Sequence, residues 1–152
     1  MLDWSLTQNE YPVAIKVPGG SMISTGVPVT KDFSKLDTYE ITKKGSRVAI
    51  LGLGTFYETA VKAANILKTS HGIDATVINP YYISGIDADT LNELKKDHAV
   101  VATLEDGYLE GGFGAKIAAY YGSSDMKVLN FGIKKEFIDR YDAVSYTHLR
   151  AH

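Results

Sequence analysis

The sequence contains no cysteine among its 152 residues. This absence excludes a disulfide framework, a thiolate nucleophile and a cysteine-ligated metal, and it fits a reducing compartment. A strong excess of one charge is also missing, since 16 Lys and Arg stand against 18 Asp and Glu, which gives a net charge of −2. The chain therefore lacks the broad positive field that attracts a protein to nucleic acid or to an anionic membrane.

Long apolar runs are missing as well. No stretch reaches the roughly 18 apolar residues of a membrane-spanning helix, and the first residues, MLDWSLTQNEY, have neither the basic region nor the apolar core of a secretory signal. With 45% hydrophobic and 22% charged residues, the composition is that of a globular domain large enough to bury a core. We expect an intracellular, cytoplasmic protein, or a piece of one.

The last nine residues, 144–152 (VSYTHLRAH), resemble the translated read-through of a sequencing adaptor, and we exclude them from fold reasoning. The remaining 152 − 9 = 143 residues contain two histidines, His71 and His98, each isolated at an expected helix end. A lone imidazole in such a place is typically solvated or caps the last helical turn. A histidine-based metal site is therefore not expected.

After Gly45, short apolar strands alternate with segments of helical periodicity. Strands are predicted over 47–51, 74–79, 100–104 and 127–131, and helices over 55–70, 87–96, 115–121 and 134–141. Thr55 is the expected cap of the first helix, and Asp87 or Asp89 that of the second. Continuous apolar strands between helices indicate a parallel sheet covered on both faces. The predicted fold class is α/β, a three-layer, doubly wound, mostly parallel sheet.

The chain before Gly45 is less regular. Residues 2–8 read as the tail of a helix, and residues 11–17 (YPVAIKV) predict a strand ended by a Pro-Gly-Gly sequence. Residues 21–45 show no clear periodicity, as in a linker. We therefore expect a domain boundary near Gly45.

A glycine-containing turn, LGLGTFY, follows the strand over 47–51 and opens a helix, which is the setting of a phosphate-binding turn. The third glycine of a dinucleotide fingerprint is missing where Tyr57 stands, and Asn79 replaces the acidic residue that would hold a ribose. The alternative is that the glycines only permit a tight turn. Gly52, Gly54 and Thr55 remain a candidate anion site.

An acidic, glycine-rich segment, residues 104–115 (LEDGYLEGGFGA), follows another strand, where α/β sheets place their ligands. Glu105 with Asp106 or Glu110 could form an acid/base pair or hold a hard cation. The alternative is that the glycines let the loop pack at an interface and begin a helix. The interface or ligand-edge candidates are Glu105, Asp106, Gly107, Gly111, Gly112 and Gly114.

Two further patterns have a structural and a functional interpretation. Asp106-Gly107 followed by Asn130 loosely resembles a motif that holds a metal and a diphosphate, but Asn130 is expected inside or at the end of a strand. The tyrosine pairs at 81–82 and 120–121 fit either core or rim packing or a role in association.

The order of these features resembles the C-terminal part of the transketolase family, with the deoxyxylulose-phosphate synthase branch the most similar. The resemblance rests on the Pro-Gly that ends the first apolar run, the LGLGT turn, NPYYISGID at 79–87 and EDGYLEGGFG at 105–114. It covers residues 1–143. It implies that residues 1–20 end a pyrimidine-binding domain, that 21–45 are an interdomain linker, and that 46–143 are a C-terminal domain with a structural and dimer-forming role.

The resemblance also implies a homodimeric parent enzyme that uses thiamine diphosphate and Mg²⁺ to join a two-carbon unit from pyruvate to glyceraldehyde 3-phosphate. Cofactor-binding, metal-binding and catalytic residues are not expected in this chain, which is expected to be inactive alone. Gly19 stands where the family usually has an arginine for the substrate phosphate, so the aldehyde acceptor stays open. Alternatives are a transketolase, the corresponding domain of an oxo-acid dehydrogenase β subunit, and a free-standing anion- or nucleotide-binding module.

Overall fold

A five-stranded sheet forms the centre of the domain in the computed structural model, which describes residues 1–17 and 32–135. The strand order is β1-β3-β2-β4-β5. The strands are β1 (Glu40–Lys43), β2 (Arg47–Gly52), β3 (Thr76–Asn79), β4 (His98–Tyr108) and β5 (Lys127–Ile133). Strands β2 to β5 run parallel, and β1 pairs antiparallel with β3.

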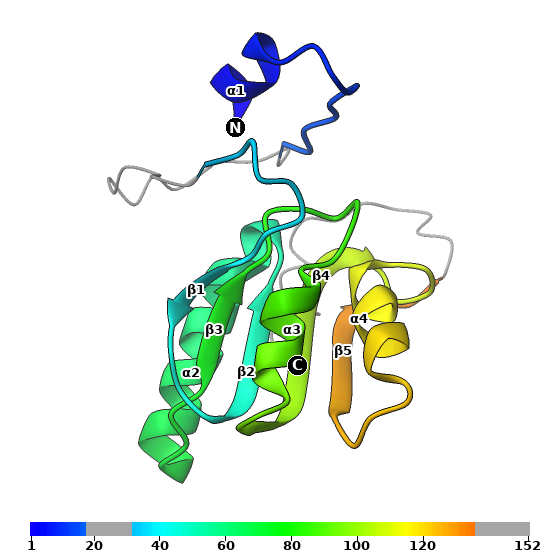
Figure 1. Ribbon diagram of the computed structural model, residues 1–152. Coiled ribbons are helices and arrows are strands. Elements are labelled where there is room, and N and C mark those ends of the chain that lie inside the picture. The colour runs from blue at the N-terminus through cyan, green and yellow to red at the C-terminus, as the bar shows by residue number, and fades with distance from the viewer. Residues whose placement is uncertain (18–31, 136–152) are drawn as a thin grey trace.

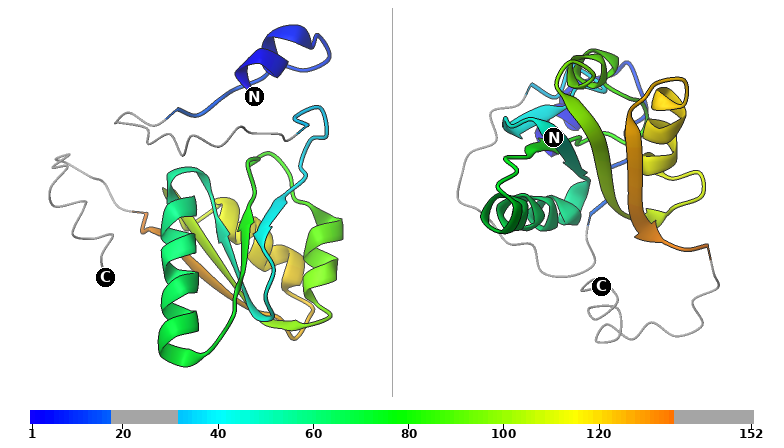
Figure 2. Two further views of the ribbon diagram at one scale, coloured as in Figure 1. Left: turned by 90° about the vertical axis from the view of Figure 1, so that its left-hand side faces the viewer. Right: turned by 90° about the horizontal axis from the view of Figure 1, so that it is seen from below.

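Helices cover both faces of this sheet. The described helices are α1 (Leu2–Thr7), the 3-10 helix η1 (Gly54–Phe56), α2 (Tyr57–His71), α3 (Ala88–Leu94) and α4 (Phe113–Tyr121), of which α2, α3 and α4 pack on the sheet. Figure 2 shows α2 on one side of the sheet and α3 and α4 on the other. The predicted class, a three-layer and mostly parallel α/β sheet, is therefore confirmed. Helix α1 buries no residue and stands apart from the sheet (Figure 1).

Two apolar clusters form the core, one on each face of the sheet. The cluster beneath α3 and α4 is built around Leu51, Leu91, Val101, Ile117 and Tyr121. The cluster beneath α2 is built around Ile50, Ala60, Ala64, Val77 and Ala102. Small side chains let α2 approach the sheet closely, and a Cβ atom on Gly52 would lie only 2.8 Å from the Cβ of Ala60.

Of the two predicted helix N-caps, that of α3 is confirmed and that of α2 is wrong. Asp87 caps α3 as predicted, because its Oδ1 accepts the backbone N–H of Thr90 at 3.0 Å. Thr55 does not cap α2. It lies inside η1, and the N-cap of α2 is Phe56, which makes no side-chain cap bond. The prediction is wrong because the chain completes a 3-10 turn before the α-helix begins.

Two expectations for the first part of the chain are also wrong. Residues 11–17 form no strand, because none of the described strands runs beside them to supply ladder hydrogen bonds. Strand β1 lies within the expected linker, so the sheet begins at Glu40 and not near Gly45. Ile41 joins the core cluster beneath α3 and α4, which gives this short segment a reason to pair with β3.

Some expectations fall outside the described residues. These are Gly19, residues 21–31 of the predicted linker, residues 136–141 of the predicted closing helix and the segment 144–152. Among the helices of the described ranges, none combines the length and the hydropathy that crossing a bilayer requires.

Candidate functional site

The acidic segment is partly strand and partly turn. β4 continues past its expected end at Leu104 and includes Glu105 to Tyr108, with a register shift against β5 between Leu104 and Tyr108. Helix α4 then begins at Phe113, and its N-cap is Gly112. The segment therefore connects the end of β4 directly to the start of α4.

The side chain of Glu105 is buried at this connection, with 4% of the residue exposed. Its Oε2 accepts the backbone N–H of Phe113 at 2.9 Å, and its Oε1 accepts that of Gly114 at 2.8 Å. The first amides of a helix have no intrahelical acceptor, and a carboxylate both satisfies them and complements the helix dipole. The protein's own side chain thus occupies the position at which an anion would bind to α4.

Three glycines make room for this arrangement. A Cβ atom would lie 2.9 Å from Glu105 Oε2 at Gly107, 2.2 Å from the carbonyl oxygen of Tyr108 at Gly112, and 2.5 Å from Thr103 Oγ1 at Gly114. Contacts of that length are not tolerated, so a side chain at these positions would displace the strand, the helix or the carboxylate. Gly111 has a different role, because its φ of +72° turns the chain between β4 and α4.

The other two acidic side chains of the segment point to other partners. Asp106 forms an ion pair with Lys16, and Glu110 lies 3.4 Å from the Nζ of Lys135. An acid/base pair or a hard-cation site needs carboxylates that converge. The structure does not bring Glu105, Asp106 and Glu110 together in this way.

Asn130 lies inside β5, as expected. Its Oδ1 accepts a hydrogen bond from Thr103 Oγ1 at 2.8 Å, and both residues lie against Gly114 at the start of α4. The amide therefore pairs with the neighbouring strand and does not form a ligand set with Asp106.

The LGLGT turn lies at the carboxyl end of β2. Gly52 is buried against α2, and a Cβ there would lie 2.7 Å from the Cα of Tyr57. Gly54 has a φ of +58° with open space around it, and Thr55 is exposed. In a dinucleotide-binding fold, the third glycine of the fingerprint lets the helix approach the sheet closely. In this chain Gly52 allows the close approach of α2 to the sheet.

The residues of these segments do not fit thiamine diphosphate with Mg²⁺. Across residues 1–17 and 32–135, no group of three metal-binding side chains converges. Both oxygens of Glu105 already accept backbone amides, and Asp106 already faces Lys16. We derive no step through the cofactor in this chain.

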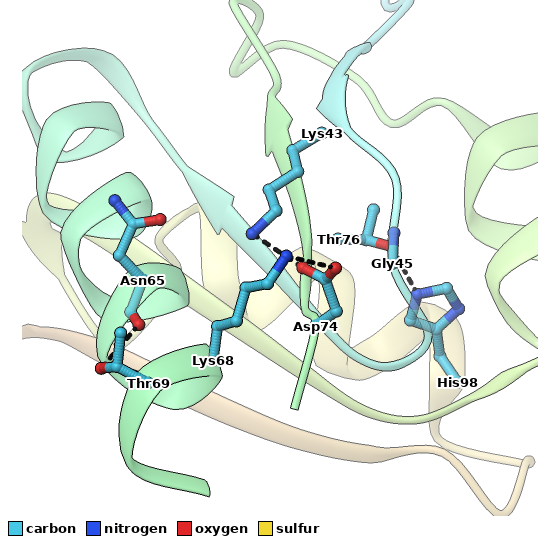
Figure 3. A network of polar contacts seen from close by, with 8 residues as sticks. All are labelled: Lys43, Gly45, Asn65, Lys68, Thr69, Asp74, Thr76 and His98. Carbon is cyan, nitrogen blue, oxygen red and sulfur yellow. Dashed lines mark hydrogen bonds and ion pairs between the residues drawn. The ribbon is translucent and has the colours of Figure 1, made fainter. Parts of the chain in front are cut away.

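A polar network that the sequence did not reveal lies at the opposite edge of the sheet, where the parallel strands begin (Figure 3). Asp74 lies 2.8 Å from the Nζ of Lys43 and 3.0 Å from that of Lys68. Hydrogen bonds from these two lysines lower the pKa of the Asp74 carboxyl. The network holds the start of β3 between the end of β1 and α2.

The second part of this network corrects an expectation. His98 begins β4, and only 4% of its side chain is exposed, so it is neither solvated nor at a helix end. Its Nε2 lies 2.7 Å from Thr76 Oγ1, which also accepts the backbone N–H of Gly45 at 3.0 Å. Its Nδ1 lies 2.6 Å from Asp97 Oδ1, without the alignment of a hydrogen bond. His71 ends α2 and is exposed, as expected.

Comparisons with known proteins agree with this architecture. The family described as "Transketolase, C-terminal domain" matches residues 37–150. The 1-deoxy-D-xylulose-5-phosphate synthase of Clostridium acetobutylicum is 37% identical over 141 residues, covering 91% of this chain and 22% of that protein. The synthase of Pseudoalteromonas translucida is 34% identical over 133 residues, covering 86% of this chain and 20% of that protein.

The fold of this chain is also similar to that of a solved structure. The chain is similar to a "split gene transketolase, inactive beta4 tetramer", with a TM-score of 0.66 and 23% sequence identity. The match covers 84% of this chain and 40% of that one. The chain spans about one fifth of the length of the two curated relatives.

Proposed function

Because the chain belongs to the transketolase C-terminal domain family, we propose that it is the C-terminal part of a thiamine-diphosphate-dependent transferase of the 1-deoxy-D-xylulose-5-phosphate synthase type. Curated synthases that are 31–37% identical over most of the chain support this choice over a transketolase. The whole enzyme joins a two-carbon unit from pyruvate to glyceraldehyde 3-phosphate, in a pathway that supplies isoprenoid precursors. It works in the cytoplasm.

Within that enzyme, the acidic segment of this chain has a structural role. The observation that carries this proposal is the position of the Glu105 carboxylate, which is buried and accepts a backbone amide on each oxygen. A carboxylate that is buried and bonded in this way satisfies the first amides of α4. Gly107, Gly112 and Gly114 supply the space that lets β4, α4 and the carboxylate meet.

The catalytic cofactor belongs to other parts of the enzyme. Thiamine diphosphate supplies the carbanion chemistry of such transferases when it is bound with Mg²⁺. We assign residues 1–20 to the end of the pyrimidine-binding domain, residues 21–39 to the linker, and residues 40–143, which include β1, to the C-terminal domain. The chain's own contribution is to hold the assembled enzyme in its active arrangement.

The chain also contributes to the association of two copies of the enzyme. Leu129 and Phe131 pair in register with Ala102 and Leu104, which lie on the α2 face of the sheet. The two β5 side chains are 38% and 54% exposed, because α2 packs over β2 and β3. An exposed apolar surface of this kind is typical of an interface. We place a contact of the homodimer there.

A chimera tests the proposal. In it, this chain replaces the matching C-terminal fifth of the Clostridium acetobutylicum synthase, and the condensation of pyruvate with glyceraldehyde 3-phosphate is measured. We expect a folded, dimeric chimera with activity, and an inactive preparation when the replaced part is simply deleted. A chimera that folds and binds thiamine diphosphate but neither decarboxylates pyruvate nor joins its two-carbon unit to any aldehyde would refute the assignment.

A further inference from the structure

Two segments far apart in the sequence lie against each other at the edge of the sheet where β3 ends. One is the loop 81–87 (YYISGID), which connects β3 to α3. The other is the segment 33–40, through which the chain enters the domain before β1. Aromatic packing joins them at one end, where the rings of Phe33 and Tyr81 meet edge to face with centroids 5.8 Å apart.

Hydrogen bonds join the two segments along their whole length. The hydroxyl of Tyr82 donates to the carbonyl oxygen of Phe33 at 3.0 Å. Ser84 Oγ donates to Asp37 Oδ1 at 3.0 Å. These bonds hold the first half of the entering segment, which has no strand ladder of its own.

The second half of the entering segment is held in the same way. Asp87 Oδ2 accepts the backbone N–H of Tyr39 at 2.8 Å, and the hydroxyl of Tyr81 donates to Glu40 Oε2 at 2.5 Å. The buried ring of Tyr39 packs into the core cluster beneath α3 and α4. Each bonded position of the loop thus has its own partner in the entering segment.

The shapes of the two segments also match. A Cβ atom on Gly85 would lie 2.3 Å from Oδ2 of Asp37, so the loop has glycine where that carboxylate passes. Asp37 and Tyr81 have positive φ values of 53° and 60°. Such a conformation is strained in a residue with a side chain, and it persists only where surrounding contacts fix it.

The loop also connects the entering segment to helix α3. Asp87 is the N-cap of α3, and its Oδ2 accepts both the hydroxyl of Thr90 at 2.8 Å and the amide of Tyr39. One carboxylate therefore joins the entering segment to the first turn of α3. The direction of the entering chain is fixed relative to the helical layer as well as to the sheet.

We propose that the loop 81–87 is a clamp that sets the direction in which the preceding polypeptide enters this domain. Tyr82, Ser84 and Asp87 are its positioning residues, and Gly85 provides the fit. Where the preceding residues belong to another domain, as the proposed function has it, the clamp fixes the orientation of the two domains. That last step rests on the proposed function, whereas the clamp itself does not.

Limited proteolysis of the full 152-residue chain tests the clamp. Lys35 is exposed and lies inside the held segment, so trypsin cleaves after it only when residues around it open locally. The test variant combines Tyr82→Phe with Ser84→Ala, which removes two of the clamp's hydrogen bonds and little volume. The matched control is Tyr120→Phe, which removes a tyrosine hydrogen bond, to the carbonyl oxygen of Ala88, outside the clamp.

We expect cleavage at Lys35 to rise about tenfold in the double variant and to stay unchanged in the control, since each lost hydrogen bond eases local opening. The thermal midpoint of the double variant should stay close to that of the control. Cleavage that is unchanged at Lys35 would overturn the proposal. So would an equal rise at lysines throughout the sheet, because that result indicates global unfolding. The readout needs no enzymatic activity, so its failure is distinct from failure of the chimera.

Discussion

Glu105 Oε1 accepts the backbone N–H of Gly114 at 2.8 Å, which joins the end of β4 to the first turn of α4. The open end of a helix attracts anions, and at this end the anion belongs to the protein. The same bond explains why an acidic residue and a glycine occur in one segment. The carboxylate needs the helix amides, and the helix start can reach the carboxylate only where no side chain intervenes.

Neutralising Glu105 should therefore destabilise the domain. In Glu105→Gln one amide keeps an acceptor, but the side-chain NH₂ faces the other backbone N–H, and a buried donor without a partner costs about 1–3 kcal/mol. The matched control is Glu110→Gln, in the same segment but exposed. Urea denaturation should show the loss for Glu105→Gln alone. Equal stability of the two variants would remove the structural role from Glu105.

The lack of space around Gly112 predicts that a side chain at this position destabilises the domain. In Gly112→Ala the new methyl group would meet the carbonyl oxygen of Tyr108, which belongs to the strand backbone and cannot move aside. We expect a loss of about 1–3 kcal/mol in the free energy of unfolding. Gly122→Ala is the control, since the nearest atom to its Cβ is 3.4 Å away, and it should stay within about 0.5 kcal/mol of the parent. Comparable losses in both variants would contradict this account.

Asp74 predicts a pH dependence. Lys43 and Lys68 hold the pKa of its carboxyl below the ordinary value. A lowered pKa stabilises the folded state above the unfolded value of about 3.9, and that contribution disappears as the pH falls through the folded pKa. The thermal midpoint of Asp74→Asn should therefore lie slightly below that of the parent at pH 7, and the difference should shrink in acid and vanish once the Asp74 carboxyl is protonated in the folded state. Asp125→Asn is the control, because Asp125 makes no ion pair with any described residue. A gap for Asp74→Asn that persists in acid would contradict the assignment.

The exposed apolar residues of β5 predict how the chain associates. Replacing Phe131 by serine removes the larger of the two side chains on the open part of the α2 face, so sedimentation should show weaker self-association for Phe131→Ser. The control is Ile66→Ser, an equally apolar side chain on α2 that is 61% exposed. An effect of the same size in both variants would indicate nonspecific hydrophobic association and not an interface.

Much of the fold follows from the order of apolar segments. Strands β2, β4 and β5 and helices α2 and α4 lie near their predicted positions, because continuous apolar runs and helical periodicity are local properties. Strand β1 was missed for the opposite reason. Its four residues gain their stability from pairing with β3, and nothing in the short sequence EITK indicates that partner. The strand predicted over residues 11–17 lacks such a partner among the described residues.

The candidate sites show the same limit. The sequence places Glu105, Asp106 and Glu110 close together, but direction decides chemistry, and the three carboxylates face α4, Lys16 and Lys135 respectively. His98 was misjudged because burial depends on Thr76, which comes from another strand. The sequence does not predict the clamp at 81–87, because its partners lie in a segment without periodicity.

Isothermal titration of thiamine diphosphate with Mg²⁺ into the purified chain tests the central claim most directly. The same titration into the chimera is the positive control and should give saturable binding. For the chain alone we predict no saturable heat at millimolar ligand, because its acidic side chains serve the domain's own helix and ion pairs. Saturable binding of micromolar affinity to the isolated chain would contradict the claim that it is a structural part of the enzyme.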